Sequence, residues 1–142
     1  MIKLESGDSI EFHFQVDEFQ LDIDRIKSWI RETISLEGIE LANLNVVFCS
    51  DDQLLEMNIQ HLNHDYYTDI LSFPFQYKPI IGDLFISVDR VTENAQTFKV
   101  EFIEELRRVI IHGVLHLLGH NDVEEEEELQ MRKLEDEALS RY

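Results

Sequence analysis

Residues 109–118 form an apolar segment that contains two histidines, His112 and His116, four residues apart. Residues at that spacing lie on one face of an α-helix, with β-carbons about 5–6 Å apart. Two imidazoles at that separation suit a single zinc ion. Two buried histidines without a metal would each need another polar partner. The segment therefore predicts a buried helix that carries a metal site, and the rest of the fold has to pack around it.

A glycine and an acidic residue follow this predicted helix. Gly119 stands three residues after His116 and is expected to end the helix in the left-handed conformation. The chain can then turn back towards the metal. Asp122 is the third ligand that the spacing favours, because it has the place of the third ligand in the zinc signature H-E-x-x-H-x-x-G-x-x-H. Two alternatives remain: His120 as the ligand, on ligand chemistry, or Asp122 as a simple cap of the final helix.

The second position of the zinc signature separates this chain from proteases. A zinc protease has its glutamate base there, whereas this chain has Gly113. We therefore expect the metal cage without the proteolytic base. A metalloprotease is the less favoured alternative.

Three segments resemble the YbeY family of bacterial metallo-endoribonucleases. Residues 112–122 are similar to the signature H-G-x-L-H-L-x-G-[YH]-D-H. Asn58 together with residues 68–74 resembles N-x(9)-T-D-V-L-S-F-P, and residues 82–87 resemble G-D-I-x-I-S. The three segments stand in the family's order and cover most of the chain from Asn58 to Asp122. The histidine segment is the most specific of them.

The chain departs from the family pattern at three positions. Asp122 replaces the usual third histidine, and Asn121 replaces the usual aspartate before it. A carboxylate is an acceptable zinc ligand, so the site can persist. Leu62 stands where the family usually has an arginine. If that arginine contacts phosphate in the family, this chain must use another cation.

The resemblance implies a zinc-dependent, single-strand-specific endoribonuclease that acts in 16S rRNA 3′-end maturation and ribosome quality control. Its partners would be rRNA and the small ribosomal subunit, with no DNA and no membrane. His112, His116 and Asp122 would hold one Zn²⁺ per chain, although nickel, cobalt or iron suit the same ligands. His64 and Asp65 are the catalytic candidates, because the resemblance places their loop near the cleft. A ribosome-associated metal-binding protein without catalysis is the alternative from another class.

The charge of the chain is the main objection to RNA binding. Twelve basic residues against thirty acidic ones give −18, whereas RNA-binding proteins usually have a basic surface. Residues 124–128 are all glutamate, and residues 135–137 add three more acids. We expect these acids to form a solvated face of the final helix. A bound metal would add local positive charge that the net charge does not report. Arg107 and Arg108 could grip a phosphate or simply pair with Glu104 and Glu105.

Length and composition favour one soluble, cytoplasmic domain that spans residues 1–142. Hydrophobic residues make up 44% of the chain, which is enough for a core. A single cysteine, Cys49, fits a reducing compartment and reads as a buried strand residue. The first five residues lack the apolar stretch of a signal peptide.

The periodicity predicts an α/β (α+β) domain with one small sheet and helices packed on it. The family resemblance implies that this sheet is mixed and that the histidine helix is central. The resemblance implies four or five strands. Asp83 reads as a turn residue, Asp89 as a helix cap, and Leu129 as an inward residue of the final helix. The expected strands are 9–16, 44–49, 70–73 and 83–88, and the expected helices are 22–36, 51–61, 89–98, 101–118 and 124–140.

Overall fold

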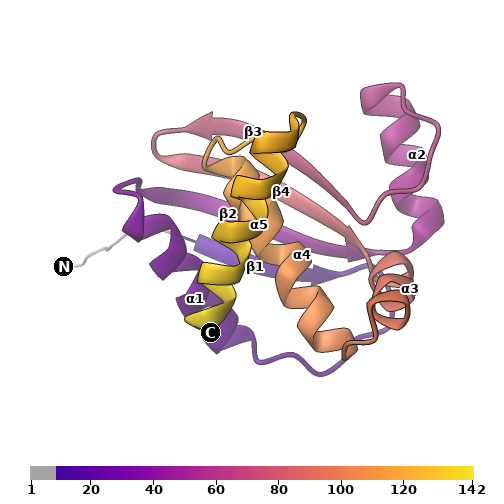
Figure 1. The fold of residues 1–142 in the computed structure, drawn as a ribbon. Helices are drawn as coiled ribbons and strands as arrows, with labels where there is room; N and C mark the ends of the chain where they lie inside the picture. Colours follow the sequence, from indigo (N-terminus) through magenta and orange to yellow (C-terminus); the bar gives the residue numbers. More distant parts are fainter. Residues whose placement is uncertain (1–8) are drawn as a thin grey trace.

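The computed structural model describes residues 9–142 and contains four strands and five helices in that range (Figure 1). The first five residues, which we used to argue against a signal peptide, lie outside it. The elements are β1 (Ser9–Phe14), α1 (Ile23–Leu36), β2 (Leu41–Cys49), α2 (Asp51–Leu62), β3 (Ile70–Tyr77), β4 (Ile80–Ser87), α3 (Val88–Phe98), α4 (Phe102–Leu117) and α5 (Glu125–Ser140).

The four strands form one mixed sheet in the order β1-β2-β4-β3. β1 pairs with β2 and β2 with β4 in parallel, whereas β3 runs antiparallel to β4. The fold is therefore α/β with a single small mixed sheet, which confirms the predicted class and the implied strand number.

One face of the sheet is buried beneath α4. Along β4, the buried residues Ile80, Leu84 and Ile86 alternate with partly exposed ones, as the two-residue period of a strand requires. Figure 1 shows α1 and α4 against the sheet, with α5 packed over α4. α4 is thus enclosed by the sheet, α1, α3 and α5, which confirms the prediction that the histidine helix is central.

Two glycines allow α4 to approach the sheet closely. A β-carbon on Gly113 would lie 2.6 Å from Cδ1 of Ile70 and 2.9 Å from Cδ2 of Leu84. A β-carbon on Gly82 would lie 2.9 Å from Cδ2 of Leu117. Since these distances are shorter than van der Waals contact, larger side chains would push α4 away from β3 and β4.

β2, β3 and β4 are longer than the sequence predicted, whereas β1 ends at Phe14 and not at Val16. β3 continues through Pro74 to Tyr77, with a register shift after the proline. This is possible because β3 is an edge strand, where a missing backbone N–H is tolerated. Asp83 is not a turn residue as predicted: it lies within β4, and its Oδ1 accepts a hydrogen bond from Asn45 Nδ2 at 3.0 Å.

The helix caps were only partly predicted. Asp22 caps α1 and accepts a hydrogen bond from the backbone of Arg25, as expected. Asp89 does not cap α3. That helix begins at Val88, and its cap is the Ser87 hydroxyl, which accepts a hydrogen bond from the backbone of Arg90 at 3.1 Å.

The final helix differs from its predicted packing in one residue. Leu129 was expected to face inward, but it is 67% exposed. Met131 and Ala138 are buried instead. Within residues 9–142, no helix is both long and apolar enough to span a membrane.

Candidate metal centre

α4 presents His112 and His116 on one face, as their spacing predicts. Their Nε2 atoms lie 3.0 Å apart, and their ring centroids are separated by 4.6 Å. Both side chains are about a quarter exposed, so they line the surface of a cleft and are not sealed in the core. The pair is therefore accessible to a metal ion and to a substrate.

The turn after α4 brings a carboxylate to this pair. Gly119 has φ +96°, the left-handed conformation that the sequence predicted. Oδ2 of Asp122 then lies 3.2 Å from His112 Nε2 and 3.4 Å from His116 Nε2. The alternative that Asp122 caps the final helix is wrong, because Glu124 occupies the N-cap of α5.

The three ligand atoms fit a tetrahedral ion. Bonds of about 2.0–2.1 Å at tetrahedral angles place neighbouring ligand atoms roughly 3.3 Å apart. The separations among His112, His116 and Asp122 are 3.0, 3.2 and 3.4 Å. Among the described residues, these three alone form a group of histidine, cysteine or acidic side chains that could hold a metal.

Glu135 supports the first histidine from α5. Its Oε2 lies 2.6 Å from Nδ1 of His112, and its side chain is 6% exposed. A carboxylate at Nδ1 keeps a proton on that nitrogen and leaves Nε2 free to bind a metal. The expectation that residues 135–137 are all solvated is therefore wrong for Glu135, which is buried against α4.

Arg108 in turn holds Glu135. Its Nη1 donates to Oε1 of Glu135 and its Nη2 donates to Oδ1 of Asp136, each at 2.8 Å. The predicted pairing with Glu104 or Glu105 is wrong, because α5 packs across α4 and offers its own carboxylates. Arg108 thus fixes the orientation of the carboxylate that fixes His112.

The pKa values of the three groups follow from these contacts. Burial disfavours the charged form of His112, but the hydrogen bond and charge of Glu135 outweigh it and raise the pKa of His112 above its usual value. Burial and the neighbouring His112 lower the pKa of His116. Burial raises the pKa of Glu135, but the hydrogen bonds from His112 and Arg108 outweigh it and lower that pKa.

His120, the alternative ligand, lies apart from this cluster. Its Nε2 is 2.8 Å from Oε2 of Glu37, at the C-terminal end of α1. Its backbone N–H donates to the carbonyl of Leu115 and helps to close the turn after α4. The structure therefore brings Asp122, and not His120, to the histidine pair.

A cavity of about 610 Å³ opens beside the histidines. Seven residues between Tyr66 and Pro74 line this cavity, together with His112, His116 and the turn after α4. Tyr66 contributes to this lining, whereas His64 and Asp65 are exposed and do not. His64 is linked to the cleft indirectly, because its ring stacks on Tyr66 and its Nδ1 lies 2.9 Å from the Tyr66 hydroxyl.

Asp69 is a carboxyl at the cleft that the sequence did not indicate. It lines the cavity with the histidines, and its Oδ2 accepts a hydrogen bond from Asn94 Nδ2 at 3.4 Å. Burial raises its pKa, although the charge of His112 opposes the shift. The sequence gives no sign of its partial burial.

Comparison with known proteins decides the family. The family model for endoribonuclease YbeY matches residues 11–142. The chain belongs to the endoribonuclease YbeY family. It is 44% identical over 135 residues to the endoribonuclease YbeY of Flavobacterium psychrophilum, which covers 94% of this chain and 96% of that relative. It is 47% identical over 113 residues to that of Phocaeicola vulgatus, covering 79% of this chain and 82% of that relative.

A solved structure has a similar fold. The solution structure of TM1509 from Thermotoga maritima matches with a TM-score of 0.65 at 28% identity. The match covers 94% of this chain and 91% of that one.

Packing at Gly113 separates this member of the YbeY family from zinc proteases. The position is buried and faces Ile70 and Leu84 of the sheet. Even the β-carbon of a glutamate there would lie 2.6 Å from Cδ1 of Ile70 and 2.9 Å from Cδ2 of Leu84. The protein thus has no room for the protease base at that position.

Proposed function

We propose that this protein is a zinc-dependent endoribonuclease that cleaves single-stranded RNA in 16S rRNA 3′-end maturation and ribosome quality control. The observation that carries the proposal is the His112, His116 and Asp122 cluster in a chain of the endoribonuclease YbeY family. Its substrate would be rRNA in the small ribosomal subunit, in the cytoplasm. Endoribonucleases are hydrolases, so the reaction adds water across a phosphodiester.

His112, His116 and Asp122 would hold the ion, and the fourth position would remain open. A zinc ion lowers the pKa of a bound water towards about 7 and can polarise a phosphoryl oxygen. Glu135 keeps the proton on Nδ1 of His112, so that Nε2 presents its lone pair to the metal. Arg108 holds Glu135 in the orientation that this requires.

Two side chains near the cleft are candidates for proton transfer. We retain His64 as a candidate base, because its Nδ1 meets the hydroxyl of Tyr66 and Tyr66 lines the cleft. Asp65, the other candidate, stays a prediction with no described contact to the cleft. Asp69 keeps its proton to a higher pH than an ordinary aspartate, which suits a donor to the leaving oxygen.

A binding protein with a structural metal is the second candidate. The charge of −18 favours it. So does Leu62, which places a half-exposed apolar side chain where the family usually has an arginine. This candidate predicts that metal removal unfolds the protein and that the metal-loaded protein leaves RNA intact.

The test is cleavage of a labelled single-stranded RNA by the zinc-loaded protein, by the chelated protein and by the protein after zinc is restored. We expect the zinc-loaded protein to cleave the RNA, the chelated protein to leave it intact, and the zinc-restored protein to cleave it again. The zinc-loaded protein should not hydrolyse casein. Intact RNA with a loaded metal would select the binding protein. Casein hydrolysis would select a protease.

A further inference from the structure

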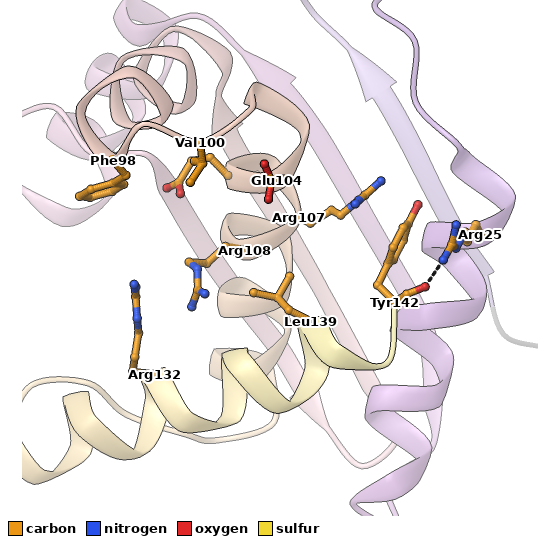
Figure 2. A pocket seen from close by; sticks show the side chains of 10 residues that line it. Arg25, Phe98, Val100, Glu104, Arg107, Arg108, Arg132, Leu139 and Tyr142 are labelled. Carbon is orange, nitrogen blue, oxygen red and sulfur yellow. Dashed lines mark hydrogen bonds between the residues drawn. The ribbon is translucent and has the colours of Figure 1, made fainter.

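A second cavity, of about 690 Å³, is lined by Arg108 and nine other residues, none of which is a histidine (Figure 2). It is enclosed by α4, α5, α1 and the residues that follow α3. Its volume is within the range of about 300–1,000 Å³ that is typical of ligand sites. Nothing in the proposed metal chemistry uses it.

Arginine dominates the lining of this cavity. Four of the chain's twelve basic residues lie there: Arg25, Arg107, Arg108 and Arg132. Two acids, Glu104 and Glu105, line the same cavity, so its formal charge is positive in a chain of −18. A positive cavity in an acidic protein is suited to an anion.

The side chain of Arg107 lines this cavity without a described hydrogen-bond acceptor. Its Nε is buried and has no hydrogen-bond partner. Within residues 9–142 it forms no ion pair; its guanidinium carbon lies 3.9 Å from the ring centroid of Tyr142. Since none of its guanidinium N–H groups has a described acceptor, Arg107 can donate to a ligand oxygen in the cavity without breaking an existing hydrogen bond.

Two further arginines keep N–H donors without a described acceptor, although Nη2 of Arg25 donates to the main-chain oxygen of Tyr142 (Figure 2). Figure 2 shows Arg25 and Arg107 on opposite sides of the Tyr142 ring, and the Arg25 guanidinium carbon is 4.1 Å from its centroid. The side chain of Arg132 is 64% exposed, and its closest described carboxylate is Glu135 at 4.0 Å. Arg108 differs from these three, because Glu135 and Asp136 already occupy its guanidinium.

We propose that this arginine pocket, formed by Arg25, Arg107, Arg132 and Tyr142, binds a backbone phosphate of the single-stranded RNA substrate. Guanidinium groups match the geometry of phosphate oxygens. The ring of Phe98, which is 60% exposed, offers a surface on which a base can stack. The inference rests on the proposed function. It supplies a positively charged group for phosphate, which Leu62 cannot provide at the position where the family usually has an arginine.

The pocket is close enough to the metal centre to hold the same strand. A smaller cavity of about 240 Å³ adjoins both, because Arg108 and Arg132 line it together with His112 and Asp69. Arg107 precedes His112 by five residues on α4, which is about 7.5 Å along the helix axis. A strand held at the pocket would therefore pass directly to the cleft beside the histidines.

The test is the kinetics of RNA cleavage by zinc-loaded protein at several salt concentrations. Arg107→Ala and Arg132→Ala should each raise KM about tenfold, with kcat within about twofold of wild type, because a phosphate contact far from the reacting bond mainly holds the strand. Each should reduce the slope of log(kcat/KM) against log salt by about 0.7, the contribution of one phosphate contact on a single strand. Unchanged KM and slope in both variants would overturn the proposal.

Lys133→Ala is the matched control. It removes one positive charge from the neighbouring residue of α5, which does not line the pocket, and it should keep the wild-type KM and slope. Arg107→Lys should recover the slope, since it keeps the charge. If Arg107→Ala fails to fold, the KM and salt slope of Arg132→Ala decide the test, because Arg132 is exposed.

The fluorescence of the single tryptophan can show whether the pocket binds RNA or a free nucleotide. Trp29 packs edge-on against Tyr142, with ring centroids 5.1 Å apart, so its fluorescence should respond when the pocket fills. We expect a response to a short single-stranded RNA at far lower concentration than to uridine monophosphate. Equal responses, with RNA kinetics unchanged by the substitutions, would assign the pocket to a free nucleotide and overturn the RNA assignment. If the wild type fails to cleave RNA at all, the proposed function itself has failed.

Discussion

Nδ1 of His112 lies 2.6 Å from Oε2 of Glu135, although 23 residues separate the two along the chain. The contact joins α4, which carries the histidine pair, to α5, which was expected to have a solvated acidic face. Metal-binding histidines usually donate their second ring N–H to a carboxylate or carbonyl. The pairing therefore makes Glu135 part of the support of the metal centre.

Glu135→Gln should weaken zinc binding about tenfold to a hundredfold, the usual effect of removing such a partner. The amide is neutral and accepts a weaker hydrogen bond from His112. Competition against a chromophoric chelator measures the affinity directly.

Asp136→Asn is the control for that substitution. Asp136 binds the other side of the Arg108 guanidinium but does not contact His112. It should leave zinc affinity within about threefold of wild type, because a surface ion pair contributes little. Equal losses in both variants would mean that the charge of α5, and not the contact with His112, matters.

In the metal-free protein, the His112 ring should titrate at a higher pH than the His116 ring. Glu135 raises the pKa of His112, whereas burial and His112 lower that of His116. Nuclear magnetic resonance of the two imidazoles against pH measures the order. Glu135→Gln should move the His112 titration to lower pH, since the anion that favours its protonated form is gone. An unchanged His112 titration in that variant would contradict the assigned cause.

The sequence could predict the parts of this site that depend on local spacing. The histidine pair follows from the helical period, and the position of Asp122 follows from the glycine that ends α4. Glu135 could not be found in this way, because its burial depends on how α5 packs across α4. A glutamate next to Asp136 and Glu137, both exposed, looks the same in sequence whether it faces solvent or a histidine.

The same distinction explains the errors in the fold. The ends of helices that are followed by a turn glycine were predicted well. In contrast, β3 was predicted to end before Pro74, although the strand continues to Tyr77. Only the sheet order shows that β3 is an edge strand that tolerates a proline. Leu129 was placed inside by its period, but it is exposed, whereas Met131 two residues later is buried.

Gly113→Ala should destabilise the protein by about 1–3 kcal/mol, the usual cost of overpacking a core. Its new β-carbon would meet Cδ1 of Ile70 at 2.6 Å. Chemical denaturation with guanidinium measures the loss. Ile70→Val removes that Cδ1 atom, so the double variant should lose less stability than the sum of the two single variants. Simple additivity would show that the contact does not limit the approach of α4.

Cys49 should react slowly with iodoacetamide in the native protein. Burial raises the pKa of its thiol to about 11, so almost no thiolate exists at pH 8. Labelling in guanidinium should be faster by at least about a hundredfold, since unfolding restores both the ordinary pKa and access. Mass spectrometry against time measures the two rates. Rapid native labelling at pH 8 would contradict the buried position of Cys49 in β2.

Zinc content of purified variants tests the metal centre most directly. Asp122→Ala should lose most of the metal, because it removes one of three ligands, whereas His120→Ala should keep it, since His120 pairs with Glu37. Asp122→His should retain zinc and shift the activity profile to lower pH, because a neutral imidazole makes the site more positive and its bound water more acidic. Loss of zinc from His120→Ala together with its retention in Asp122→Ala would contradict the assignment and make His120 the third ligand.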